Sequence, residues 1–350
     1  MRNLRILISN TTRIFIGVVI LTMISCKMVR CQDNWEISSL YEQQINSTTL
    51  SQLDKYINAN LPHLQSLLIA RHGKLVFEQY YHGGSKTEMH NMQSITKSIT
   101  SALVGIALKK NYIKTTDQRI IDFFPEATAD TSIDKRIKNI TINHLLTMSS
   151  GIVEGKAGWD KDDNPFRTAL QQHLKSDPGT QFNYSSLAAH VFTGILFRAT
   201  KESLYDFANK ELFQPLGIEK VIWYTDKNGM YLGCGSSLWK SQDLLKIGQL
   251  YLNKGMWNGI EIIPETYINQ SSKTQISGNF FGTHVNYGYM WFTETISGYN
   301  VFFAKGYGGQ YLMVIPDLNM TILCTSDWHQ PEYPEHYAIV KDYIIPSVIK

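Results

Sequence analysis

A Ser-x-x-Lys sequence, Ser94 to Lys97, begins a stretch whose apolar residues recur at helical spacing. Ser94 is therefore expected at a helix N-terminus, where backbone N–H groups are free and the helix dipole favours negative charge. Residues three apart share a helical face, so the Lys97 amine can meet the Ser94 hydroxyl. The apolar residues have the pattern of a helix buried along one stripe: Ile95, Ile99, Ala102, Leu103, Ile106 and Ala107.

The context of this pair matters, because the spacing alone is common. A serine hydroxyl is a weak nucleophile unless a neighbouring base takes its proton, and a desolvated lysine can be that base. Ser94 and Lys97 are the candidates for these two roles. Three other pairs have the spacing but lack the helix or the N-terminal position: Ser132/Lys135, Ser237/Lys240 and Ser347/Lys350.

A second stretch runs from a Pro-Gly turn at Pro178 to Tyr184, which is followed by two serines. The serines can cap the helix predicted after them. A tyrosine can shuttle protons where a nearby cation such as Lys97 stabilises its phenolate. Taken alone, Tyr184 would be one of 19 structural tyrosines. Its place after the Ser94–Lys97 pair favours a catalytic role.

A third stretch, residues 304–310, reads Ala-Lys-Gly-Tyr-Gly-Gly-Gln between two apolar runs. Glycines let a backbone approach a ligand closely, as the strand that forms an oxyanion hole must. An ordinary hairpin turn would have the same composition, so the stretch by itself leaves both interpretations open.

Together the three stretches resemble the serine β-lactamase and penicillin-binding-protein superfamily, specifically its class C-like branch of esterases and peptidases. That family has Ser-x-x-Lys, then Tyr-x-Asn, then a Lys-Thr-Gly or looser strand, in this order. The resemblance covers about residues 60–327, and residues 144–151, 212–218 and 243–259 are similar to further family stretches.

The resemblance implies that Ser94 is the acylated nucleophile. Lys97 would accept its proton or tune it, and Tyr184 would activate the water that releases the acyl group. Lys97 and Tyr184 would titrate as a coupled pair, so which of them takes the first proton stays open. The backbone N–H of Ser94 and one from the 307–308 strand would form the oxyanion hole.

Two departures from the family pattern concern substrate binding. Ser186 stands at the asparagine position, so a hydroxyl replaces an amide. Ala304 stands where a cation would bind a substrate carboxylate, unless Lys305 fills that role. We assign substrate contact to Ser186, Lys305 and the following Gly306, Tyr307 and Gly308.

The departures favour an ester or amide hydrolase, with a peptide or another small molecule as substrate. A true class C-type β-lactamase and a non-catalytic envelope protein that binds peptidoglycan fragments or β-lactams are the alternatives. A Ser-His-Asp hydrolase would need a Gly-x-Ser-x-Gly elbow, which the sequence lacks. The histidines His144 and His190 lie in helical contexts that favour structural roles.

The order of strand-like and helical segments predicts an α/β fold, with an antiparallel sheet flanked by helices and an inserted all-helical lobe. Strand-like runs include residues 67–71, 74–81, 287–293, 301–304, 311–315 and 320–325. We expect an α/β lobe from residues 32–93 and 256–350 and a helical lobe from about 94–255. A short helix is expected at 50–61 and a final helix from Pro334.

The N-terminus predicts export. A basic beginning precedes an apolar run, residues 14–26, which is too short for a comfortable membrane span and typical of a secretion signal. Residues 1–31 are therefore expected to be a signal peptide, and the mature protein to be periplasmic or attached to the envelope. Residues 23–26 also resemble a bacterial lipobox, which would attach the protein to the membrane through lipidated Cys26.

Composition excludes other classes. The formal charge of +3 is small and dispersed, and no nucleic-acid-binding signature is present. No Cys/His spacing resembles a zinc site, and the acidic run 160–164 lacks the pattern of an EF-hand loop. We therefore expect no cofactor, no metal and no nucleic-acid partner. Cys324 lies in an apolar run, where a buried free thiol is expected.

Overall fold

The computed structural model describes residues 35–129, 133–330 and 336–349. All the described residues belong to one compact unit within the range Cys31–Lys350. The predicted signal peptide and Cys26 lie outside the described residues. Within the described residues, no helix combines the length and the apolar character that crossing a membrane requires.

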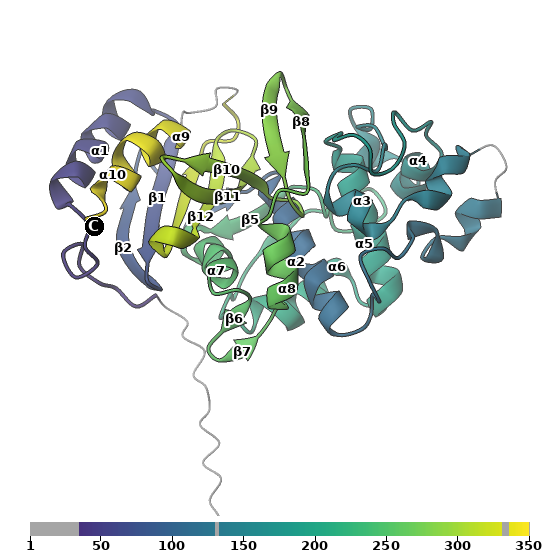
Figure 1. Ribbon diagram of the computed structural model, residues 1–350, viewed down its shortest axis with the longest axis horizontal. Coiled ribbons are helices and arrows are strands. Elements are labelled where there is room, and N and C mark those ends of the chain that lie inside the picture. The colour runs from purple at the N-terminus through teal and green to yellow at the C-terminus, as the bar shows by residue number, and fades with distance from the viewer. Residues whose placement is uncertain (1–34, 130–132, 331–335, 350) are drawn as a thin grey trace, which may run out of the picture. The chain divides into compact units, whose positions relative to one another are not determined.

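An antiparallel sheet of eight strands forms the centre of the α/β part (Figure 1). Its order is β2-β1-β13-β12-β11-β10-β9-β8. Leu67 of β1 lies opposite Cys324 of β13, so early and late segments share one sheet, as the sequence predicts. The strands are β1 (Leu64–Arg71), β2 (Lys74–Tyr80), β8 (Ile276–Phe280), β9 (Thr283–Tyr287), β10 (Phe292–Ile296), β11 (Tyr299–Gly306), β12 (Gln310–Ile315) and β13 (Met320–Ser326).

One face of the sheet is covered by helices from both ends of the chain, α1 (Ser47–Asn60), α9 (His336–Ile339) and α10 (Ile345–Ser347). A π-helical turn, Val340–Ile344, joins the last two, where the sequence predicts a single helix. Asn46 caps α1 by accepting from the N–H of Thr48 and of Thr49. The helix buries Leu50, Leu53 and Ile57, whose spacing places them on one stripe.

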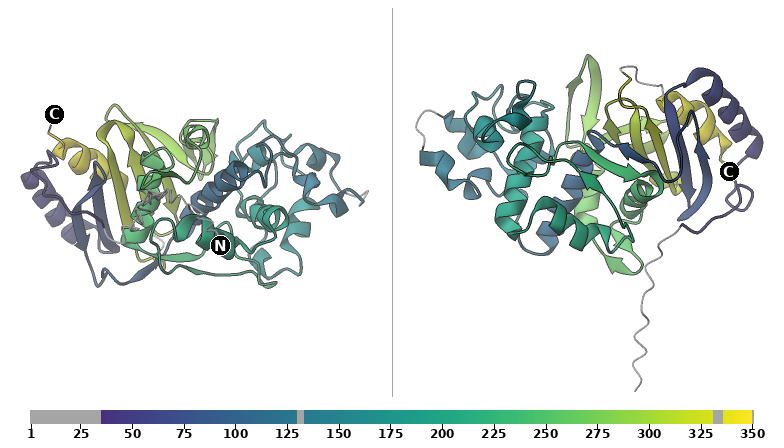
Figure 2. Two further views of the ribbon diagram at one scale, coloured as in Figure 1. Left: turned by 90° about the horizontal axis from the view of Figure 1, so that it is seen from below. Right: turned by 180° about the vertical axis from the view of Figure 1, so that it is seen from behind.

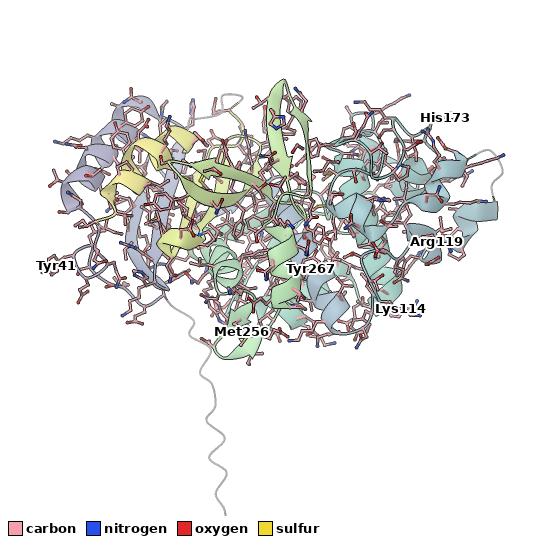
Figure 3. The ribbon with its side chains drawn as sticks, in the orientation of Figure 1. Tyr41, Lys114, Arg119, His173, Met256 and Tyr267 are labelled. Carbon is pink, nitrogen blue, oxygen red and sulfur yellow. The ribbon has the colours of Figure 1, made fainter. Side chains whose placement is uncertain are left out.

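The opposite face packs against α2 (Ile95–Lys109) and α7 (Ser241–Leu252). The α7 helix lies against β12 and β13, although its residues fall within the range expected for the helical lobe. Tyr267, labelled in Figure 3, comes from α8 (Glu265–Ser271) and donates its hydroxyl to the Ser101 carbonyl at 2.8 Å. It thereby ties α8 to α2. Two small sheets accompany these helices: β3 (Met89–Asn91), β4 (Ile222–Trp223) and β5 (Ser237–Lys240), and β6 (Met256–Trp257) with β7 (Ile260–Glu261).

The middle of the chain is helical and extends the packing of α2 away from the sheet (Figure 2). Helix α5 contacts α2, α3, α4 and α6, and buried apolar residues of all five belong to one core cluster. The inserted helices are α3 (Ile142–Leu146), α4 (Pro165–Leu170), α5 (Ser186–Thr200) and α6 (Leu204–Ala208).

One predicted strand is wrong. Residues 287–293 do not form a single strand, because β9 ends at Tyr287 and β10 begins at Phe292. The intervening backbone bonds to helical segments instead of the sheet: Met290 N–H donates to the Leu146 carbonyl, and its carbonyl accepts from Ser98. Aromatic residues throughout this stretch give it a strand-like sequence. Its backbone, however, makes hydrogen bonds with other parts of the chain and not with a neighbouring strand.

Candidate active site

Ser94 occupies the N-cap position of α2, as the sequence predicts. Gln93 before it has a φ of +49°, a conformation that side-chain-bearing residues adopt at an energetic cost and that is concentrated at functional sites. The Gln93 N–H donates to Asn91 Oδ1 at 3.1 Å, which holds this turn. Ser94 itself is half-buried, so its hydroxyl stays accessible.

Lys97 lies one turn into the helix with only 1% of its surface exposed. Its Nζ donates to Ser94 Oγ at 2.9 Å, to Ser186 Oγ at 3.3 Å and to the Cys234 carbonyl at 2.6 Å. An ammonium group has three N–H donors, and these contacts engage all three. The arrangement fixes the amine beside the Ser94 hydroxyl.

Tyr184 lies beside Lys97. The Lys97 Nζ is 5.0 Å from the centroid of the Tyr184 ring, within the range of a cation–π contact. The ring is held by neighbouring aromatic residues: its centroid is 4.8 Å from that of Phe280 and 6.4 Å from that of Phe292. The structure therefore brings together Ser94, Lys97 and Tyr184, which are 90 positions apart at most in the chain.

The two serines after Tyr184 have different positions. Ser185 caps α5 by accepting from the Ala188 N–H at 3.0 Å, and Ser186 points its hydroxyl at Lys97. The Ser186 N–H donates to Glu154 Oε2 at 2.5 Å. Sequence reasoning missed Glu154, because it lies in a loop without a recognisable motif.

The third stretch lies beside the nucleophile. A Cβ added at Gly306, the last residue of β11, would stand 2.3 Å from the carbonyl oxygen of Met92, two residues before Ser94. A Cβ at Gly308, whose φ is +74°, would stand 2.4 Å from Trp328 Cα. Both positions require glycine. The turn that contains Tyr307 and Gly308 therefore begins next to Ser94.

Lys305 is not brought to this site. Strand side chains alternate between faces, and Lys305 lies with Tyr311 on the face that packs under α1, its Nζ 5.5 Å from the Tyr311 ring centroid. Burial lowers the pKa of the Lys305 amine. Ala304 belongs to the core on the α2 side. The sequence left two alternatives for the position where the family has a substrate-binding cation, Ala304 or Lys305. The geometry supports Ala304 at this position.

Two further residues support the site and were missed from the sequence. The Cys234 carbonyl accepts from Lys97, while burial raises the pKa of the Cys234 thiol to about 11. The buried Gln310 side chain donates to the carbonyls of Gly308 at 3.2 Å and Ser326 at 2.8 Å, and accepts from the Ser326 N–H at 3.1 Å. It holds the turn after β11 in place. Only the glycine-rich context of Gln310 could have indicated this role.

His144 and His190, the histidines that a Ser-His-Asp hydrolase could use, both make contacts that support the fold. His144 Nδ1 accepts from the Thr141 N–H and completes a capping box at α3. His190 is buried, with Nε2 3.2 Å from Asp226 Oδ2. Within the described residues, no group of three or more His, Cys, Asp and Glu side chains could hold a metal ion.

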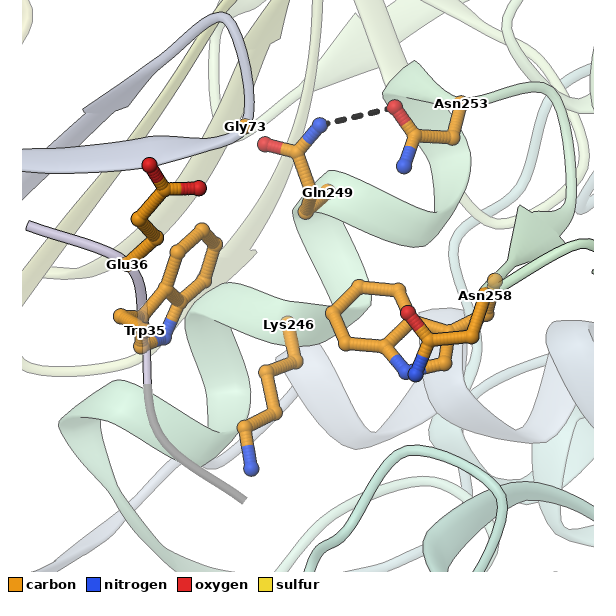
Figure 4. Close-up of a pocket in the computed structure, with 8 residues that line it drawn as sticks. Trp35, Glu36, Gly73, Lys246, Gln249, Asn253 and Asn258 are labelled. Atoms are coloured by element: carbon orange, nitrogen blue, oxygen red, sulfur yellow. Dashed lines mark hydrogen bonds between the residues drawn. The ribbon is translucent and has the colours of Figure 1, made fainter. Parts of the chain in front are cut away.

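A separate small pocket lies beside α7 (Figure 4), and Trp35 and Trp257 are among the residues that line it. The Gln249 amide nitrogen donates to Asn253 Oδ1 at 2.8 Å within it. None of the three sequence stretches contributes to its lining, so this pocket is distinct from the Ser94 site.

Comparison with known proteins bears on the family and the fold. The family described as Beta-lactamase matches residues 63–342. The 6-aminohexanoate-dimer hydrolase of Paenarthrobacter ureafaciens is 22% identical over 290 residues, covering 76% of this chain and 73% of that protein.

Two solved structures share the fold. A Bacillus anthracis protein, provisionally described as a 6-aminohexanoate-dimer hydrolase, has a TM-score of 0.73 at 19% identity, covering 90% of this chain and 87% of that one. A family VIII carboxylesterase has a TM-score of 0.71 at 15% identity, covering 87% and 98%. With most of its length matched by the family and its fold shared with these structures, this chain belongs to the β-lactamase family.

Proposed function

We propose that the protein is a serine hydrolase that cleaves ester or amide bonds through an acyl-enzyme on Ser94. The observation that carries the proposal is the 2.9 Å contact between Lys97 Nζ and Ser94 Oγ at the N-terminus of α2. A nucleophile within hydrogen-bond reach of its base is the arrangement that covalent catalysis requires. The hydrolase names of two relatives support the proposal.

Acylation begins when the Ser94 hydroxyl loses its proton to a neutral Lys97 amine or, through it, to a Tyr184 phenolate. A neutral amine keeps two N–H donors for Ser186 and the Cys234 carbonyl, and its lone pair faces Ser94. The Ser94 oxygen attacks the substrate carbonyl. The oxyanion of the tetrahedral intermediate accepts hydrogen bonds from the backbone N–H groups of Ser94 and of the 307–308 turn. Collapse breaks the bond to the leaving group, which departs with the proton.

Deacylation reverses these roles. Tyr184, half-buried beside Lys97, takes a proton from water as the water oxygen attacks the acyl carbonyl. Collapse of the second tetrahedral intermediate returns the proton to Ser94 and releases the acid. The residues thus act as a unit, with the Lys97 amine bonded to Ser94 and lying over the Tyr184 ring.

Ala304 and Ser186 bear on the substrate. A β-lactam carboxylate is usually met by a cation at the Ala304 position and its amide by an asparagine at the Ser186 position, as the family motifs imply. The described structure has neither group in these places, which supports ordinary esters and amides over β-lactams. Kinetics with short-chain 4-nitrophenyl esters, D-amino-acid peptides and a chromogenic cephalosporin test this assignment. The proposal expects ester or peptide turnover to exceed cephalosporin turnover; preferred cephalosporin hydrolysis would indicate a β-lactamase, and no turnover would indicate a binding protein.

A further inference from the structure

The turn that carries Tyr184, residues 183–186, is held by a neighbouring segment, residues 152–154. Three hydrogen bonds join the two segments in order along the chain. They run from Asn183 Nδ2 to the Ile152 carbonyl at 2.8 Å, from Ser185 Oγ to the Val153 carbonyl at 3.1 Å and from the Ser186 N–H to Glu154 Oε2 at 2.5 Å. Because these bonds flank Tyr184, they fix the chain on both sides of it.

The supporting segment is itself fixed by residues that follow α4. The Val153 N–H donates to Gln172 Oε1 at 3.0 Å. A Cβ at Gly151, whose φ is +79°, would stand 2.3 Å from the Ser176 carbonyl oxygen, so two stretches of backbone meet closely there. The segment therefore gives the Tyr184 turn a firm base.

The bond from Glu154 is the one that bears on the Lys97 amine. Ser186 is the first residue of α5, and an N–H in the first turn of a helix has no partner within that helix. A carboxylate at this end also complements the helix dipole. The Ser186 hydroxyl points at Lys97, with Oγ 3.3 Å from Nζ. Glu154 therefore fixes the backbone from which one acceptor of the amine projects.

The charge of Glu154 lies close to the site, although its side chain is exposed. Burial raises the pKa of the Cys234 thiol to about 11, while the charge of Lys97 lowers this pKa and that of Glu154 raises it. The Cys234 carbonyl is another acceptor of the Lys97 amine. Both charges thus act on one buried residue of the site.

We propose that Glu154 is a positioning residue, which acts through Ser186 to hold the Lys97 amine beside the Ser94 hydroxyl. The inference rests on the proposed function and adds a residue to it. Loss of the carboxylate frees the Ser186 N–H, so the acceptor of the amine loses its fixed place. A base that is misplaced with respect to the nucleophile slows the chemical step. We therefore expect kcat to fall while KM changes little.

The test is a double-variant cycle on kcat for 4-nitrophenyl butanoate. Glu154→Ala should lower kcat about tenfold, the size of a hydrogen bond to a charged group. In a Ser186→Ala background, which lacks the positioned hydroxyl, the same change should lower kcat by about twofold at most, because the two residues act through one contact. Glu154→Gln should keep most of the kcat, since its amide oxygen still accepts the N–H. Equal losses in both backgrounds, or equal losses in Glu154→Gln and Glu154→Ala, would overturn the proposal.

Glu42→Ala is the matched control. The Glu42 carboxylate is also exposed and also accepts a backbone N–H, that of Ser39 at 3.0 Å, but it lies in the segment before α1. This variant should keep the kcat of the unmodified protein. A loss as large as that of Glu154→Ala would assign the effect to a general loss of structure and would contradict the positioning role.

Amide hydrogen exchange followed by NMR separates this inference from the hydrolase proposal, because it needs no turnover. Faster exchange of the Ser186 N–H in Glu154→Ala, and not in Glu154→Gln, supports the positioning of Ser186 even if Ser94 is not the nucleophile. Unchanged exchange in Glu154→Ala overturns the inference even if the protein is a hydrolase. Failure of the hydrolase proposal itself would appear as undiminished ester turnover by Ser94→Ala.

Discussion

Lys97 Nζ lies 2.9 Å from Ser94 Oγ and is held there by two further acceptors, Ser186 Oγ and the Cys234 carbonyl. As an ammonium it donates to all three. As a neutral amine it keeps the last two and turns its lone pair to the serine hydroxyl. The same position therefore serves before and after proton transfer, without movement of a buried side chain.

Loss of Lys97 or of Tyr184 should slow turnover. Lys97→Ala and Tyr184→Phe should each lower kcat/KM for a 4-nitrophenyl ester by about 10²-fold or more, the scale of a lost general acid–base group. Residues that act as a unit are not additive, so the double variant should be little worse than the poorer single variant.

The matched control for this series is Lys240→Ala. Lys240 also follows a serine at the same spacing, Ser237, but lies on β5. Steady-state kinetics of the control should match the unmodified protein. Multiplicative losses in the Lys97/Tyr184 double variant would show that the two residues act independently, contrary to the proposed proton path.

Gly306 should tolerate no side chain. In Gly306→Ala the new Cβ would stand 2.3 Å from the Met92 carbonyl, and overpacking of this kind typically costs about 1–3 kcal/mol. The displaced turn also carries the proposed oxyanion donors, so kcat should fall together with the free energy of unfolding. Denaturant unfolding and ester kinetics on the same preparation measure both quantities.

Gly248→Ala is the control that separates a loss of stability from a loss of kcat. Its Cβ would stand 2.9 Å from Leu312 Cδ1, where α7 meets the sheet. This variant should lose stability but keep kcat for the folded fraction. A Gly306→Ala protein with unchanged kcat would show that the turn has no part in catalysis.

The stability of the helical part should depend on pH through Asp134. Hydrogen bonds from Arg136 hold the pKa of this carboxyl below its ordinary value of 3.8. A pKa that is lower in the folded than in the unfolded protein gives stability above about pH 4, and this contribution is lost as the pH falls below it. Asp134→Asn should therefore lower the free energy of unfolding at pH 7 by about 1–3 kcal/mol, and the difference should shrink at low pH.

Asp177→Asn is the control for this prediction. Asp177 also contacts Arg136, at 2.9 Å, but its side chain is 68% exposed. Exposed ion pairs contribute about 0–1 kcal/mol, so the change should be small across the pH range. A pH-independent loss in Asp134→Asn, measured by urea unfolding at pH 3 and pH 7, would contradict the charge-based explanation.

Local patterns predicted the parts of the fold that local chemistry determines. The helix after Ser94 and the strands β1, β12 and β13 have periodic, buried apolar residues, and the sequence shows them. The segment between Tyr287 and Phe292 has an equally apolar sequence, but its backbone bonds to α3 and to Ser98. Such partners are decided by tertiary contacts, which a local pattern does not contain.

The candidate site also has some residues that the sequence could predict and others that depend on tertiary contacts. Ser94, Lys97 and Tyr184 lie in recognisable stretches, and the structure brings them together. The face on which Lys305 lies depends on the register of β11 in the sheet, so its sequence position next to Gly306 was misleading. Cys234 acts through its backbone carbonyl and Glu154 through a contact with a backbone N–H, and neither role depends on a motif that a sequence could show.

The acylation of Ser94 is the central claim, and intact-protein mass spectrometry after treatment with a fluorophosphonate tests it most directly. We expect one adduct, mapped by peptide digestion to Ser94, and no adduct on Ser94→Ala. Ser347→Ala, which alters a serine of the same Ser-x-x-Lys spacing in α10, should be labelled as fully as the unmodified protein. Labelling of Ser94→Ala at the same rate, or an adduct on another residue of the unmodified protein, would contradict the assignment of Ser94 as the nucleophile.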